Sequence, residues 1–169
     1  MLKPIIKFFV ALNGNIRKSQ IAAGIAWGVL LGLVPASNFF GIVLFIVSFF
    51  FTHNHGAKIL ALALLKLCSP LIAPLIDSIG WQVLHIEALQ PLFTTMYNMP
   101  FVPFTNFNNT LVAGGLAGGV ILWLPVFFIF MGLILLYRNT LSPKIRNTKL
   151  VKFLVKLPFL SIIDKAIKS

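Results

Sequence analysis

The chain has 169 residues, of which 59% are hydrophobic and only 10% are charged. Soluble domains carry about 25% charged residues, so this composition excludes an ordinary soluble globular enzyme and a disordered chain. The net charge of +11 does not indicate nucleic-acid binding, because the basic residues gather near the two ends and none lies between residues 67 and 137. Basic ends around an uncharged middle predict an integral membrane protein with both termini in the cytoplasm.

Residues 1–18 are predicted to contain an amphipathic helix that lies in the membrane interface. Leu2, Ile5 and Phe9 share one helical face, and the following Asn-Gly-Asn at residues 13–15 is typical of a helix end. The helix is too short to span a bilayer, so it is expected to lie on the surface.

Residues 19–89 are predicted to form a membrane domain with two broken helical hairpins. The first apolar block, residues 21–51, is interrupted at residues 35–38, where proline removes a backbone donor and Ser and Asn offer competing hydrogen bonds. Each half is about 20 Å long, against a hydrocarbon core of about 30 Å. We expect a re-entrant hairpin that enters and leaves on one side, with two steeply thinned crossings as the alternative.

The second apolar block, residues 59–86, repeats this plan with a break at residues 69–74. Two apolar segments broken by proline with Ser or Asn form a weak internal repeat. Paired broken helices in membrane proteins often mark a central binding site.

The rest of the chain predicts a loop, a span and a tail. Residues 90–110 are uncharged and rich in Pro, Asn and Phe, and predict a non-cytoplasmic loop that rests on the bilayer. Residues 111–138 predict a transmembrane helix, and residues 139–169 predict a basic amphipathic cytoplasmic tail. The fold class is therefore all-α. The aromatic residues of the loop that are expected to contact a partner are Phe93, Tyr97, Phe101, Phe104 and Phe107.

Small residues recur at helical spacing in two segments. The set comprises Gly24, Gly28, Gly32, Gly114 and Gly118. Such spacing lets helix backbones approach closely in lipid, so tight helix packing is the first interpretation. The alternative is a groove for lipid or a partner, shaped together with the residues of the two breaks, Pro35, Asn38, Ser69, Pro70 and Pro74.

Lys66 and Asp77 are charged residues on either side of the second break. If this segment folds back, the two side chains face each other near membrane depth, where pairing offsets the cost of an isolated charge. The alternatives are a Lys66 side chain that extends to the interface and a proton or ion relay.

The histidines, His53 and His55 with His85, do not predict a metal centre. His53 and His55 on a short turn supply only two poorly arranged ligands, and the acids Asp77 and Glu87 are not tied to them. Nothing orients Ser78, His85 and Asp77 as a catalytic triad. We therefore expect no catalytic residue, no metal and no cofactor.

Two stretches carry a family resemblance. Residues 21–35, IAAGIAWGVLLGLVP, resemble the opening signature of a family of small bacterial inner-membrane proteins of unknown function. Residues 68–75, CSPLIAPL, with the later Gly80, are similar to that family's second block, in which Asn stands at the position of Ser69. The full length is similar to a subgroup, in bacteria with outer membranes, that is typically encoded beside a large AsmA-like protein.

The resemblance implies a partner, because AsmA-like proteins resemble periplasmic bridges that move lipid between the inner and outer membranes. We expect a non-enzymatic inner-membrane component that anchors and assists such a partner in phospholipid transport. The partners would be membrane phospholipids and the AsmA-like protein, and a homo-oligomer is left open. The alternative is a small secondary transporter or channel for an unidentified solute.

Overall fold

The computed structural model describes residues 16–35 and 38–141, and every regular element in these two ranges is helical. The longer helices are α2 (Lys18–Leu33), α3 (Phe39–Val47), α4 (His55–Leu84), α5 (Gln90–Tyr97) and α6 (Thr110–Leu136). Short 3-10 turns cover Ser48–Phe50, Glu87–Leu89 and Val102–Thr105, and a π-helical turn at Tyr137–Leu141 extends α6. The predicted interfacial helix and nearly all of the predicted tail lie outside the described residues.

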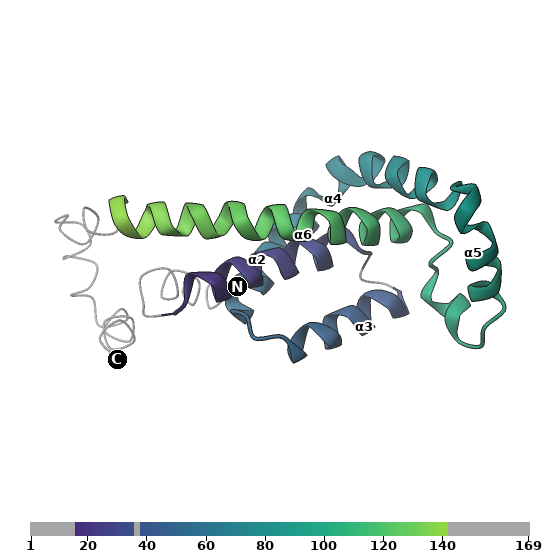
Figure 1. Cartoon of the computed structure of the whole chain (residues 1–169), viewed down its shortest axis with the longest axis horizontal. Helices are drawn as coiled ribbons and strands as arrows, with labels where there is room; N and C mark the ends of the chain where they lie inside the picture. The colour runs from purple at the N-terminus through teal and green to yellow at the C-terminus, as the bar shows by residue number, and fades with distance from the viewer. Residues whose placement is uncertain (1–15, 36–37, 142–169) are drawn as a thin grey trace.

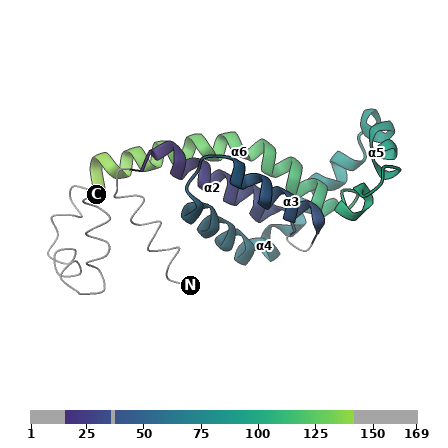
Figure 2. The same cartoon turned by 90° about the horizontal axis from the view of Figure 1, so that it is seen from below.

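α2, α4 and α6 pack together as a three-helix bundle, and α3 lies along its outside (Figures 1 and 2). α2 and α4 run parallel, because residues 24, 28 and 32 of α2 meet residues 57, 58 and 65 of α4 in ascending order. α6 runs antiparallel to α2, because its residues 115 and 119 meet residues 33 and 30 in descending order.

The chain is broken between α2 and α3, where Pro35 stands. Val34 has an extended backbone, with φ −80° and ψ 132°, the conformation that a following proline favours. Asn38 caps α3, because its Oδ1 accepts a 2.6 Å hydrogen bond from the amide of Gly41. α3 then returns along the bundle toward the end at which α2 began (Figure 1). At 1.5 Å per residue α2 is about 24 Å long, which is less than the thickness of a hydrocarbon core.

The second predicted hairpin is wrong, because α4 is one helix of 30 residues that contains both Pro70 and Pro74. A proline within a helix leaves the carbonyl four residues earlier without its N–H donor. For Pro70 that carbonyl belongs to Lys66, and the Ser69 hydroxyl donates to it at 2.9 Å. Serine side chains commonly satisfy such carbonyls in apolar helices. α4 therefore bends behind α6 without folding back (Figures 1 and 2), and the two apolar blocks are not structural repeats.

Residues 90–110 form a cap across the far ends of α4 and α6 (Figure 1). The prolines restrict it to the eight-residue α5 and the 3-10 turn Val102–Thr105, as expected for a segment without a long helix. Phe101 and Asn106 on either side of that turn have φ of 70° and 51°. A positive φ is uncommon for Phe, and the surrounding structure must compensate its strain.

Two of the described helices are long and apolar enough to cross a membrane, His55–Leu84 and Thr110–Thr140. Proline at position 125 does not interrupt the second of them. Most of the surface of both helices lies outside the packed core, and large apolar side chains such as Leu67, Leu71 and Ile121 are between 69% and 81% exposed. Such surfaces are typical of helices that face lipid.

Candidate functional site

The glycine row of α2 lies directly against α4. A Cβ at Gly28 would be 2.5 Å from the carbonyl oxygen of Lys58, and one at Gly32 would be 2.7 Å from the Cβ of Leu65. Gly24 lies equally close to the backbone that precedes α4. This face is therefore filled by a neighbouring helix and leaves no room for an acyl chain.

A second glycine contact joins α4 to α6. Gly114 lies against the carbonyl of Ile76, and Gly80 lies against the start of α6. Gly118 has more room, since its nearest neighbour would be Ile79 Cδ1 at 3.9 Å. Close approach of backbones through small residues holds the three long helices together in an apolar solvent.

Lys66 binds the tip of the hairpin, and the predicted ion pair with Asp77 is wrong. The Lys66 ammonium donates a 2.7 Å hydrogen bond to the carbonyl of Val34, at the C-terminal end of α2. A cation at this end complements the partial negative charge of the helix. Asp77 instead accepts a hydrogen bond from the Thr110 hydroxyl. Because α4 is continuous, the two charged residues are separated by 11 residues, or about 16 Å of helix.

Lys58 binds the returning end of the hairpin, a role that the sequence analysis missed. Its side chain is completely buried, and its ammonium donates to the Ser48 hydroxyl at 2.8 Å. The same ammonium lies 3.8 Å from the ring centroid of Phe49 and 5.0 Å from that of Phe45, so cation–π attraction replaces lost hydration. A lysine inside an apolar run was the available signal, but its partners are nine or more positions away.

The histidines lie at opposite ends of α4. The rings of His53 and His55 are 4.7 Å apart, whereas His85 stacks on Trp81 near the other end of the helix. Among the described residues, no group of three or more metal-ligating side chains forms. Burial, and then the charges of Lys58 and His55, lower the pKa of His53 to about 4.

The residues of the hypothetical triad have other partners. Ser78 donates to the carbonyl of Pro74 at 3.0 Å, and the Nδ1 of His85 lies 2.7 Å from the carbonyl of Trp81. Since Asp77 binds at the start of α6, the three side chains do not form a hydrogen-bonded chain.

The residues of the predicted groove are divided between two places. Pro35 and Asn38 lie at the hairpin tip, where Asn38 is only 5% exposed and its Nδ2 has no hydrogen-bond partner among the described residues. Ser69, Pro70 and Pro74 lie within α4, with both prolines exposed on its surface.

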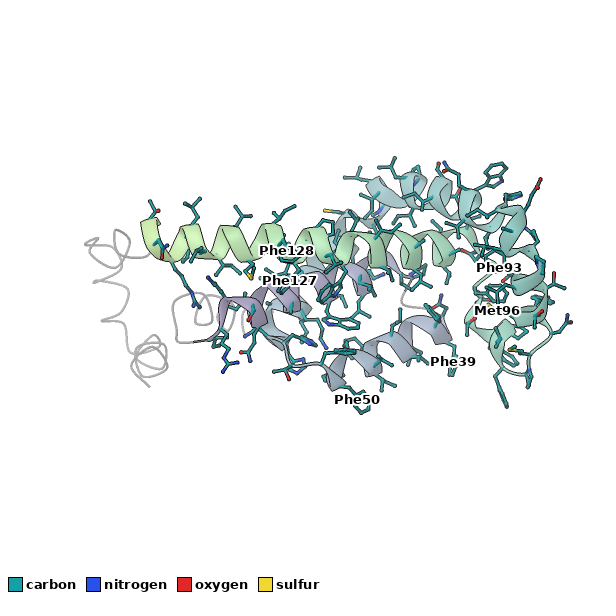
Figure 3. All side chains as sticks on the ribbon, in the orientation of Figure 1. Phe39, Phe50, Phe93, Met96, Phe127 and Phe128 are labelled. Atoms are coloured by element: carbon teal, nitrogen blue, oxygen red, sulfur yellow. The ribbon has the colours of Figure 1, made fainter. Side chains whose placement is uncertain are left out.

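An apolar cavity of about 560 Å³ lies at the far end of the bundle, beneath the cap. Phe93 and Met96 of α5 line it (Figure 3), together with Leu84 of α4, Phe40 of α3, and the face of α6 around Ala117. Thr105 is the polar residue among its lining side chains. The volume is within the range of roughly 300–1,000 Å³ that is usual for small-molecule sites.

The five aromatic residues of the cap divide into two groups. Phe93 and Phe107 line the cavity, with their ring centroids 6.1 Å apart. Tyr97, Phe101 and Phe104 are between 55% and 75% exposed. Two of the residues predicted to contact a partner therefore line a cavity, and three lie on the surface of the cap.

These features define an all-helical protein with two helices that can cross a membrane and an apolar cavity at one end of its bundle. Over 156 residues the chain is 33% identical to an "Uncharacterized protein" of Treponema pallidum (strain Nichols), covering 92% of this chain and 96% of that protein. The chain belongs to the same family as that protein. No family model and no solved structure matches it.

Proposed function

We propose that the protein is a non-enzymatic component of a bacterial inner membrane that assists a periplasmic AsmA-like partner in moving phospholipid toward the outer membrane. The observation that carries the proposal is the apolar cavity beneath the cap, since a hollow lined by hydrocarbon side chains suits an acyl chain. The AsmA-like partner comes from the sequence resemblance.

In this proposal, α4 and α6 cross the bilayer, and the hairpin of α2 and α3 enters and leaves from the cytoplasm. The charge pattern supports this orientation. Arg17, Lys18 and Arg138 lie near one end of the described bundle, whereas no Lys or Arg occurs between residues 67 and 137, which include the whole cap. Lys and Arg concentrate on the cytoplasmic side of membrane proteins, so the cap and its cavity would face the periplasm.

The hairpin contributes to the cavity wall through Phe40, close to the start of α3. Because Lys66 binds its tip and Lys58 binds its returning end, the hairpin is held to α4 at two points. A wall held in this way keeps the cavity open without its ligand, which reduces the cost of ordering on binding. An acyl chain would leave the outer leaflet, enter beneath the cap and pass to the partner.

A variant that fills the cavity tests the proposal. Ala117→Trp puts a large ring among the lining residues of α6, and Ile129→Trp is its matched control, because Ile129 is 58% exposed outside the cavity. In cells, we expect the first variant to slow the arrival of newly made phospholipid at the outer membrane and the second to leave it unchanged.

The partner is tested by cross-linking in intact cells from a photoreactive residue at Phe104 on the cap surface, with Phe128 on α6 as the control position. Figure 3 shows that Phe128 lies on α6, away from the cap. Recovery of an AsmA-like protein from the first position alone supports the proposal. Normal phospholipid delivery by Ala117→Trp, with no such protein cross-linked, would refute it. Solute flux in proteoliposomes, lost in the same variant, would instead support a transporter.

A further inference from the structure

A second pocket, also of about 560 Å³, adjoins the apolar cavity beneath the cap. The two share three lining residues, Leu84, Phe93 and Phe107. The Phe93–Phe107 ring pair therefore lies at the boundary between the two pockets. Unlike those of the first, most of the residues that line the second pocket carry a polar group, among them Gln90, Asn98 and Asn108.

Four of the side chains that line this second pocket, those of Gln90, Thr94, Asn98 and Thr110, each donate a hydrogen bond within the protein. Gln90 Nε2 donates to the carbonyl of Leu84, and Asn98 Nδ2 donates to the carbonyl of Thr94. The hydroxyls of Thr94 and Thr110 donate to Gln90 and Asp77 respectively. The side-chain oxygens of these residues remain as acceptors. These oxygens can accept hydrogen bonds from a ligand that brings N–H or O–H donors.

The distribution of charge around this pocket disfavours an anionic head group. Neither pocket is lined by Lys or Arg, and the chain has none between residues 67 and 137. The carboxylate of Asp77 is bound to Thr110, which lines the second pocket, and Glu87 lies on the adjoining turn. An anionic head group would lose hydration here and gain no countercharge. Two titratable side chains line the second pocket, Tyr97 and His85, and the Nδ1 of His85 lies 2.7 Å from a backbone carbonyl.

We propose that the two pockets form one site for a membrane amphiphile whose head group carries no net negative charge and is rich in hydrogen-bond donors. The acyl chain occupies the apolar cavity, and the head group lies beyond the Phe93–Phe107 pair, against the acceptors of Gln90 and Asn98. This inference rests on the proposed function and defines its substrate class. Two lipids share the chemistry, a phosphatidylethanolamine with its ammonium and a glucosyl diacylglycerol with its hydroxyls.

Binding of defined lipids to the purified full-length chain tests the inference, with native mass spectrometry as the readout. Phosphatidylethanolamine, glucosyl diacylglycerol and phosphatidylglycerol with identical acyl chains are compared in one detergent. We expect at least one of the first two lipids to bind about tenfold more tightly than phosphatidylglycerol, the ratio that corresponds to one favourable polar interaction. Which of the two binds better identifies the source of the head group, and a preference for glucosyl diacylglycerol would make the cargo of the proposed function a glycolipid in place of a phospholipid.

A matched pair of variants at Asn108, on the rim of the polar pocket, isolates the head-group contribution. Asn108→Lys introduces the missing cation and is expected to shift the preference toward phosphatidylglycerol, whereas Asn108→Asp preserves or increases the original preference. Ala117→Trp should abolish the binding of all three lipids, because it fills the chain compartment.

The possible failures are distinguishable. Equal binding of the three lipids, unchanged by Asn108→Lys but lost in Ala117→Trp, would overturn the head-group inference and leave the proposed function standing. A preference for phosphatidylglycerol in the unmodified chain would also overturn the inference. Binding that Ala117→Trp does not affect would overturn both, because lipid would then not occupy the cavity.

Discussion

The close contact between α2 and α4 makes Gly28→Ala a direct test of how the bundle is held together. The added Cβ would lie 2.5 Å from the carbonyl oxygen of Lys58 and 2.6 Å from the Cβ of Ala61. Ordinary van der Waals contact begins at 3.4 Å, so the two helices would have to move apart by about 0.9 Å at this point. The nearest obstacle is a helix backbone, which cannot move aside as a flexible side chain can.

The size of the effect follows from two opposing terms. Overpacking of this kind costs about 1–3 kcal/mol, and Gly→Ala within a helix returns up to about 1 kcal/mol. Gly132→Ala in α6 gains only the helix-propensity term, because a Cβ there meets nothing within 4 Å. Since the propensity term is common to the two variants, their difference in the free energy of unfolding reports the steric cost alone, about 1–3 kcal/mol.

The assay is unfolding of the purified protein in mixed micelles by increasing SDS, followed by tryptophan fluorescence. Trp27 of α2 and Trp123 of α6 are suitable reporters, because their rings meet edge to face with centroids 6.5 Å apart. Gly118→Ala is a second control, with its nearest neighbour at 3.9 Å. If Gly28→Ala unfolds at the same SDS concentration as Gly132→Ala, glycine-mediated contact between α2 and α4 does not stabilise the bundle.

Three other predictions concern α4, its N-terminal turn and its orientation. Ser69→Ala should lower the free energy of unfolding by about 1 kcal/mol in the native chain. In a chain that already carries Pro70→Ala, which restores the missing N–H, the same change should have little effect. Additive effects in this double-mutant cycle would contradict the account of the continuous helix. The pKa of His53 is lowered from 6.5 to about 4 in the folded state, so the stability that its neutral ring contributes is complete above pH 6.5 and is lost as pH falls toward 4, by roughly 1–3 kcal/mol. His53→Phe should therefore flatten the pH dependence of the free energy of unfolding in this range. An unchanged pH profile would refute the lowered pKa of His53. In a variant without the native cysteine, impermeant thiol reagents should label Asn54→Cys from the cytoplasm only and Asn98→Cys from the periplasm only; labelling of both from one side would refute the proposed crossing.

The two proline-containing blocks show how far local sequence predicts this fold. Both combine proline with Ser or Asn in an apolar run, and both were expected to break. Pro70 leaves the carbonyl of Lys66 without its N–H donor, and the hydroxyl of Ser69, three residues from Lys66 in the same helix, donates to it instead. At the first break, the carbonyl of Val34, the residue that follows α2, is bound by Lys66, 32 residues along the chain. The local pattern of the two blocks is alike, so it could not show which one bends and which one turns back.

In the candidate site, too, the sequence indicated which residues stand out, whereas their roles depend on the tertiary structure. The aromatic residues of the cap were singled out by their composition, but their separation into cavity wall and exposed surface depends on how the cap folds over α4 and α6. Lys58 and Lys66 were visible as rare charges in an apolar run. Their roles were not, because Ser48 and Val34 reach them only once the hairpin has packed against α4.

The sequence by itself determined that the chain is helical and apolar enough for a membrane, and where its charges are concentrated, because these properties depend on composition and on neighbours along the chain. Only the tertiary structure decided which proline interrupts a helix, which partners Lys58 and Lys66 bind, and that a cavity lies beneath the cap. Each of these depends on groups that are distant in sequence and meet only when the helices pack.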